Sequence, residues 1–306
     1  MGSLSKRLGQ LTALSLESES SNIIRTMKPN KIRNSLSQRL DTTLKESHDM
    51  QVFGLGTLAS MANKDRYLRF TKSLYGVYST MEDEMDKCCL PSSGNNDPVV
   101  RTANNSNVGS TIEKRSGKDH DDSPVKYFWK RHSEILRRAE LLQGDIFAIS
   151  EDYLDDNDQE SSYSRATIEY MNTIKEAGRQ DRRDRSGRLL GHAYTRYLAD
   201  LMGGSMLGTP THLALRLNEG IPQQYTFSFP TTRKAYVETI YHDLNQCGKI
   251  MKDDDDLLES VVGEARGAFR HNVSVYAEEP IIVDSVLGLK NIVTGYLFHR
   301  NTNNDS

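Results

Sequence analysis

The 306-residue chain has few cysteines, namely Cys88, Cys89 and Cys247. Two of them are sequence neighbours and their number is odd, which excludes the disulfide framework of small secreted domains and favours a reducing compartment. An excess of either charge is also missing, because 39 basic and 42 acidic residues leave a formal net charge of −3. Dedicated nucleic-acid binders carry a marked basic excess, so we expect no nucleic-acid partner.

Long hydrophobic runs are absent as well. No apolar stretch reaches the roughly 20 residues that a helix needs to cross a bilayer. The nearest candidate, residues 281–298, is interrupted by Asp284, Lys290 and Asn291. We therefore expect residues 281–306 to form a C-terminal tail that docks on the protein, and no transmembrane anchor.

Two other segments have little apolar character or an unusual charge. Residues 1–34 contain six basic and two acidic residues, which is typical of a disordered basic segment or of a transit peptide. The first alternative predicts a cytoplasmic protein and the second a plastid or mitochondrial one. Residues 91–124 are rich in Ser, Asn, Gly and Asp and nearly lack large apolar side chains, so we expect a disordered insertion within one domain spanning residues 35–280.

Elsewhere the apolar residues recur every three or four positions, and no alternation with period two continues for more than a few residues. This pattern predicts an all-α bundle. Seven helices are expected. The first carries the stripe Leu36, Leu40, Leu44 and His48, and the second a stripe from Tyr67 to Met85. The others cover Ser133–Ile149, a segment capped by Ser164 and ended by Gly178, Arg188–Leu207, a segment after Phe229-Pro230, and a segment after the acidic run 253–256.

Two features of this pattern suggest chemistry. His48 continues an apolar stripe, where a histidine is either a satisfied core residue or a ligand. Gly203 and Gly204 lie inside an otherwise strong helix, where each glycine costs about 1 kcal/mol relative to alanine. Glycine at such a position permits a kink or the close approach of a flat molecule to the backbone.

In a continuous α-helix, residues four apart lie above one another. Thr195, Ala199 and Gly203 would then form one row, and Arg196, Asp200 and Gly204 the next. A strip of small side chains beside an acid suits a planar cofactor, although close packing between helices would need the same small residues. Burying Asp200 is costly without partners, which favours the functional interpretation.

Several motifs resemble those of the haem oxygenase family. Residues 192–204, His-Ala-Tyr-Thr-Arg-Tyr-Leu-Ala-Asp-Leu-Met-Gly-Gly, are similar to the family's distal-helix signature, and Leu44–His48 to the segment with its proximal histidine. Ser73–Met85 is similar to the family's next helix, and Phe269 and Asn272 match positions on its last distal helix. The similarity covers residues 35–280 outside the insertion, with the motifs in the family's order.

The resemblance implies a helical bundle with haem sandwiched between a proximal and a distal helix. It also implies an enzyme that cleaves haem, its cofactor and substrate, to biliverdin, carbon monoxide and ferrous iron, with dioxygen and electrons from a reductase or ferredoxin. His48 would ligate the iron, and Asp200 would hold a distal water network that delivers a proton. The residues implied to bind the haem are Tyr194, Thr195, Ala199, Gly203, Gly204, His242 and Phe269.

The sequence also departs from the family. Ala199 stands where the family has glycine, and Met202 where it has serine. Asp41, Glu238 and His242 occupy the places of the cations that bind the haem propionates, and acids there would repel carboxylates. These departures leave open a haem- or tetrapyrrole-binding protein of this fold without oxygenase activity, and a purely structural bundle is a third alternative.

Overall fold

The computed structural model describes residues 35–47, 50–90, 123–150 and 163–304, and the regular elements within these ranges are all helical. The expected all-α class is thereby confirmed. The basic segment 1–34, most of the insertion and His48 lie outside the described residues. Ser123 and Pro124, at the end of the expected insertion, already belong to a helix, as its N-cap and first residue.

The long helices alternate with short turns of tighter or wider winding. The α-helices are α2 (Leu36–Ser47), α3 (Met50–Ser60), α4 (Lys64–Cys89), α5 (Pro124–Leu136), α6 (Ala139–Ile149), α7 (Arg165–Asp184), α8 (Leu189–Ala193), α9 (Ala199–Met202), α10 (Gly208–Leu215), α11 (Arg233–Ile250), α12 (Asp255–Ala277) and α13 (Ile282–Asn304). A π-helical turn, η1 (Tyr194–Leu198), joins α8 to α9, and η2 (Gly204–Met206) and η3 (Gln223–Tyr225) are 3₁₀ turns.

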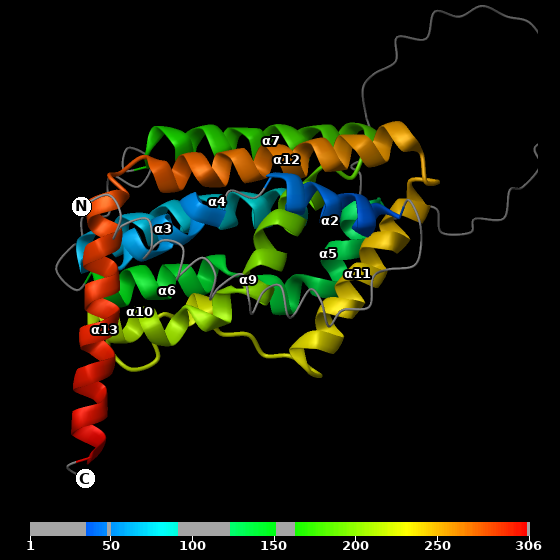
Figure 1. The fold of residues 1–306 in the computed structure, drawn as a ribbon. Coiled ribbons are helices and arrows are strands. Elements are labelled where there is room, and N and C mark those ends of the chain that lie inside the picture. The colour runs from blue at the N-terminus through cyan, green and yellow to red at the C-terminus, as the bar shows by residue number, and fades with distance from the viewer. Residues whose placement is uncertain (1–34, 48–49, 91–122, 151–162, 305–306) are drawn as a thin grey trace, which may run out of the picture.

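Figure 1 shows α7 and α12 side by side along one face of the bundle, with α4 beneath them. Helix α4 also packs on α5 and α6, and α11 packs on α2 and α5. Helix α13 crosses one end of the bundle against α3 and α10. The short segment α8–η1–α9 lies inside this arrangement, and its side chains join the main hydrophobic core.

Local sequence signals explain several helix starts. The Ser164 Oγ accepts a hydrogen bond from the Thr167 N–H at 3.1 Å, which confirms the predicted N-cap of α7. The predicted end at Gly178 is wrong, because α7 continues to Asp184. A Cβ on Gly178 would overlap the Glu84 side chain, so this glycine allows α4 and α7 to approach each other.

The helix expected over Ser133–Ile149 is interrupted at Arg137 and Arg138. The buried Glu82 carboxylate of α4 accepts hydrogen bonds from the N–H groups of Arg138 at 2.6 Å and Ala139 at 3.1 Å. A carboxylate at this place satisfies N–H groups that a helix start leaves free and favours a new helix there. The break therefore depends on a residue more than 50 positions earlier in the chain.

Two further buried carboxylates work in the same way. Asp145 accepts hydrogen bonds from the N–H groups of Gln223 and Gln224, where η3 begins. Asp181 accepts hydrogen bonds from the N–H groups of Arg188 and Leu189, where α8 begins. Burial raises the pKa of both carboxyl groups, and the N–H donors offset part of that rise.

The C-terminal segment forms a helix, α13, that docks on the bundle. Cβ atoms on Gly288 and Gly295 would collide with the backbone of α3 and α10, so these glycines permit contact between main chains. The Asn291 side chain donates hydrogen bonds to the carbonyls of Met61 at 3.1 Å and Ala62 at 2.8 Å. Among the described residues, no single helix has the length and apolar composition to cross a membrane, whereas α12 and the first 18 residues of α13 meet that criterion together, across a bend of 82°.

Candidate functional site

The segment Leu189–Met202, formed by α8, η1 and α9, carries most of the predicted site residues and is called the Asp200 helix below. Its residues from Gly191 to Leu198 are buried, whereas Ala199 and Asp200 are half-buried. Gly203, which follows directly, is half-buried as well. The helix therefore begins deep in the core and becomes partly accessible at Ala199 and Asp200, while its last residues, Leu201 and Met202, are buried again.

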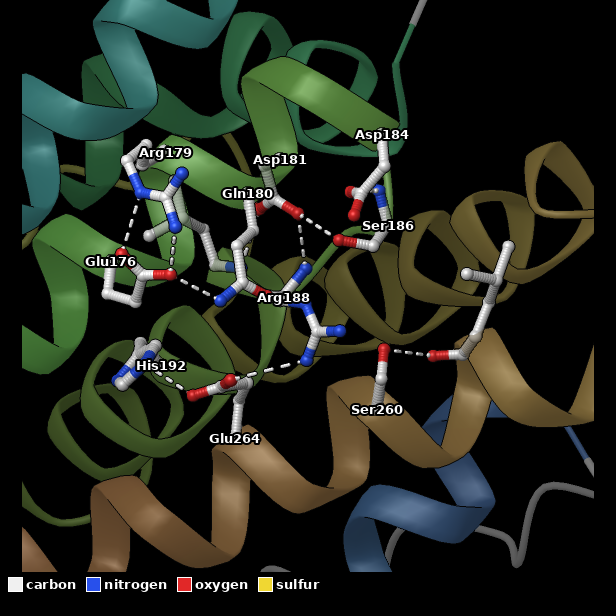
Figure 2. Close-up of polar contacts among 12 residues, drawn as sticks. Glu176, Arg179, Gln180, Asp181, Asp184, Ser186, Arg188, His192, Ser260 and Glu264 are labelled. Carbon is white, nitrogen blue, oxygen red and sulfur yellow. Dashed lines mark hydrogen bonds and ion pairs between the residues drawn. The ribbon is translucent and has the colours of Figure 1, made fainter.

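Figure 2 shows how the start of the Asp200 helix is held between α7 and α12. Besides the backbone N–H groups, Asp181 accepts a hydrogen bond from the Ser186 Oγ at 2.9 Å. On the other side, Glu264 of α12 lies 3.2 Å from the His192 Nε2 and 3.6 Å from an Arg188 Nη. These contacts fix the position from which the rest of the helix extends.

One face of the Asp200 helix touches the backbone of α12. A Cβ on Gly191 would lie 2.7 Å from the Ala265 nitrogen and would overlap the Val261 carbonyl. One turn later, the Thr195 hydroxyl donates to the Gly191 carbonyl at 3.0 Å and approaches the Ala265 carbonyl at 3.3 Å. The structure thus places Thr195 against α12, although its assignment as a haem-binding residue stays a prediction.

The winding of the Asp200 helix changes in its middle. Residues 194–198 are π-helical, a conformation that appears mostly as single turns and is frequent at functional sites. The rows predicted for a continuous α-helix therefore do not extend across this turn. The four-residue spacing from Ala199 to Gly203, which follows the turn, is retained, since the Gly203 N–H donates to the Ala199 carbonyl at 2.8 Å.

Asp200 has a polar environment contributed by three helices. The Tyr78 hydroxyl of α4 donates a hydrogen bond to the Asp200 Oδ2. The Arg196 guanidinium lies 4.8 Å from the centre of the Tyr78 ring, and its Nη1 donates to the Asn272 Oδ1 of α12 at 2.9 Å. Arg196 is also buried, so its charge lies close to the carboxylate in a poorly solvated environment.

The electrostatic balance leaves Asp200 more easily protonated than a surface aspartate. Burial raises the pKa of its carboxyl group, and the Arg196 charge, the Tyr78 hydrogen bond and the Arg138 charge oppose that rise without cancelling it. Burial also raises the pKa of Tyr78 well above its ordinary value, so the phenol keeps its proton and remains a donor. A carboxyl group with such a pKa in an accessible position is suited to proton transfer.

The two glycines after Asp200 have different surroundings. Neither has a positive φ, so neither is required by a left-handed turn. Among the described residues, a Cβ on Gly203 would meet only the Ala199 carbonyl, at 3.4 Å, whereas a Cβ on Gly204 would lie 3.3 Å from the Tyr225 ring. Gly203 thus borders free space beside the helix, and Gly204 packs against Tyr225.

Tyr194 lies at the opposite end of the π-helical turn. Its hydroxyl donates to the Asp41 Oδ1 of α2 at 2.6 Å, and the Tyr241 hydroxyl of α11 donates to the same oxygen at 2.7 Å. His242 projects to the surface, where its Nδ1 lies 3.0 Å from the Asp243 Oδ1. Glu238 is exposed.

The structure brings some predicted site residues together and separates others. Ala199, Asp200, Gly203 and Gly204 are adjacent, while Tyr194 and His242 lie away from them and Phe269 is buried on α12. Sequence reasoning assigned no role to Tyr78, Arg196 or Asn272, the residues that surround Asp200. The available signal was Tyr78 on an apolar stripe, because a buried tyrosine hydroxyl usually needs a hydrogen-bond partner.

Comparison with known proteins agrees with the resemblance seen in the sequence. The family model described as heme oxygenase matches residues 100–278. Heme oxygenase 1 of Synechocystis is 27% identical over 246 residues, which cover 79% of this chain and 84% of that protein. Heme oxygenase 2 of Mus musculus is 25% identical over 249 residues, and this chain spans 65% of that protein's length and is itself covered to 79%.

Solved structures show the same fold. Heme oxygenase-1 of Synechocystis, in complex with heme, aligns with a TM-score of 0.57 at 24% identity, over 86% of this chain and 99% of that one. Heme oxygenase 2 of Chlamydomonas reinhardtii, without heme, aligns with a TM-score of 0.60 at 17% identity, over 81% and 98% of the two chains. The expected helical architecture is confirmed by both alignments.

Proposed function

Because the chain belongs to the haem oxygenase family, we propose that it binds haem and cleaves it to biliverdin, carbon monoxide and ferrous iron. The reaction would consume dioxygen and electrons from a reductase or a ferredoxin. Bound haem would supply the redox-active iron and the ring carbon that is oxidised. His48, directly after α2, is the residue proposed to ligate the iron.

The observation that carries this proposal is the state of Asp200. Its carboxyl group is half-buried, has a raised pKa and accepts the Tyr78 hydrogen bond through Oδ2. Within the described residues, Oδ1 is left for a water molecule. Such a carboxyl can hold a water in a defined place and pass a proton through it to a substrate above the helix.

The residues around Asp200 keep it in this state. Asn272 fixes the Arg196 guanidinium at 2.9 Å, and the tyrosine ring of Tyr78 lies beside it. Nearby Tyr78 and Asp200 raise the pKa of Arg196 despite its burial, so the guanidinium stays charged. This charge limits the rise in the pKa of the Asp200 carboxyl group that burial causes.

The accessible end of the helix also fits a flat ligand. In the part of the chain that the structure describes, a Cβ on Gly203 would meet nothing but the Ala199 carbonyl, and Ala199 itself is half-buried and carries only a methyl group. A planar molecule can therefore approach the main chain here more closely than at a residue with a larger side chain. Haem is such a molecule, and this end of the helix would face its distal side.

A haem titration followed by reduction under air tests the proposal. We expect a Soret band on addition of haem, and its loss together with a rising biliverdin band after a reductase or ferredoxin system is added. A stable Soret band under these conditions would contradict the oxygenase and support the haem-binding alternative. Absence of any Soret band would contradict both.

The ligand assignment needs its own variant. His48→Ala should abolish the spectrum of histidine-ligated haem, and added imidazole should restore it by occupying the vacated position. His192→Ala is the matched control, because the His192 Nε2 already contacts Glu264. An unchanged spectrum in His48→Ala would contradict the assignment.

A further inference from the structure

Asp41 joins three elements through a single oxygen atom. Its Oδ1 accepts hydrogen bonds from Tyr194 of the Asp200 helix at 2.6 Å and from Tyr241 of α11 at 2.7 Å. Asp41 itself belongs to α2, which ends at Ser47. The contact therefore connects the helix that leads into His48 directly with the helix that carries Asp200.

The place of this contact along both helices is informative. Asp41 lies in the middle of α2. Tyr194 precedes Asp200 by six residues on the opposite helix. If haem lies between α2 and the Asp200 helix, the Asp41–Tyr194 contact limits that space at one end.

Two hydroxyl donors that converge on one carboxylate oxygen form an anion-binding arrangement. Hydrogen bonds of this kind, to a charged acceptor, are shorter and stronger than those between neutral groups. Both tyrosines retain their protons, because burial raises the pKa of each hydroxyl above its ordinary value. Asp41 thus occupies a position in which the carboxylate of a ligand would find the same two donors.

We propose that Asp41 is an affinity-determining residue that lowers the affinity for haem through the two carboxylates of haem. Asp41 accepts the hydrogen bonds of the Tyr194 and Tyr241 hydroxyls. It also places a negative charge beside the space between α2 and the Asp200 helix, where a haem carboxylate must either displace Asp41 or lie next to it. The proposal rests on haem binding under the proposed function, but it does not depend on haem cleavage.

Titration with ferric haem, without any reductant, tests this role. Asp41→Asn keeps the shape and an acceptor oxygen but removes the charge. We expect it to bind haem about ten-fold more tightly than the wild type, because removing a like charge near an anionic group improves binding. Haem dimethyl ester, which lacks free carboxylates, should bind both proteins with affinities within about two-fold of each other.

Glu238→Gln provides the matched control. Glu238 lies on α11 one turn before Tyr241 and is exposed, so its charge is screened by solvent. Its replacement should leave both affinities unchanged. Thermal unfolding of all variants without haem shows whether a change in affinity accompanies a loss of stability.

A second variant changes the affinity in the opposite direction. Tyr241→Phe removes one donor but leaves the Asp41 charge less neutralised, so haem should bind about two- to three-fold more weakly and the ester should be less affected. This variant also keeps the proposal testable if Asp41→Asn does not fold.

The outcomes separate the two proposals. Equal effects of Asp41→Asn on haem and on its ester, or weaker haem binding, would overturn the role of Asp41 and leave a contact that only stabilises the fold. Haem binding without formation of biliverdin would overturn the proposed cleavage alone. Absence of haem binding by wild type and Asp41→Asn would overturn both.

Discussion

At its C-terminal end the Asp200 helix presents a carboxylate that has one hydroxyl donor, Tyr78, and lies beside the free space at Gly203. At the π-helical turn, the Asp41 carboxylate of α2 accepts hydrogen bonds from two hydroxyls on one oxygen and connects α2 with α11 and the Asp200 helix. The Asp200 carboxylate is thus available for proton exchange, whereas the Asp41 carboxylate holds helices together. The difference lies in the number of donors and in the size of the neighbouring residues, and not in the type of acid.

Asp200→Asn should give the largest effect, and it tests whether the Asp200 carboxylate, unlike that of Asp41, exchanges protons. The amide cannot take up and release the proton, so the rate of biliverdin formation should fall about 100-fold, within the range for general acid–base groups. Haem affinity should change little. Single-turnover absorbance measurements provide the rate, with Glu238→Gln, at an exposed position, as the control that retains it. A rate within two-fold of the wild type would show that the proton reaches the substrate by another route.

Filling the free space beside Gly203 should weaken haem binding by about ten-fold, since a bulky side chain prevents close approach of a flat ligand. Gly203→Leu tests this by Soret titration. Gly263→Leu is the matched control, because a Cβ there meets no described atom within 4 Å and the residue lies exposed on α12. Equal affinities of the two variants would mean that the space at Gly203 is not where haem lies.

Removing the methyl group of Ala199 should have a smaller effect of opposite sign. Ala199→Gly gives more room next to Asp200 for an ordered water, so the yield of biliverdin per haem should rise, by about two-fold. Oxidation of a peroxidase dye should fall in parallel, because less haem would take part in peroxidase-like chemistry that competes with cleavage of the ring. An unchanged yield would place the methyl group away from the reacting atoms.

The smallest effect concerns stability and its dependence on pH. The raised pKa of Asp200 means that the folded protein holds this proton more tightly than the unfolded chain. Stability due to this group is therefore present at low pH and is lost as pH rises from about 4, the ordinary aspartate value, through the raised pKa. Urea unfolding should show Asp200→Asn becoming more stable than the wild type towards neutral pH.

Asp41→Asn should show the contrary behaviour. It weakens two charge-assisted hydrogen bonds and should lower the free energy of unfolding at neutral pH, by about 1 kcal/mol. If both substitutions shift stability in the same direction, the two carboxylates are not energetically distinct, and the comparison fails.

Features encoded by neighbouring residues could be predicted from the sequence. The Ser164 cap, the acidic start of α12 and the helical class follow from short-range spacing, and the structure confirms them. The end of α7 could not be predicted, because Gly178 serves contact with Glu84 and not helix termination. The break before α6 depends likewise on Glu82, whose contacts with Arg138 and Ala139 connect residues distant in sequence.

The same limit applies to the candidate site. The motif around Asp200 and its two glycines was recognisable, but the spacing did not separate the role of Gly203 from that of Gly204. The hydroxyl that Asp200 accepts comes from Tyr78, 122 residues earlier. Such partners are set by how helices pack, and periodicity within one helix carries no information about them.

The π-helical turn has a consequence for the phase of the Asp200 helix. Gly191 before the turn and Thr195 within it face α12, whereas Ala199 and Gly203 after it are partly accessible. Winding residues 194–198 as an ordinary α-helix, with no residue removed, would rotate everything beyond by about 100°. Asp200 would then no longer face Tyr78, and Gly203 would no longer face the free space. The length of this turn therefore directs the candidate site as much as the identity of its residues does.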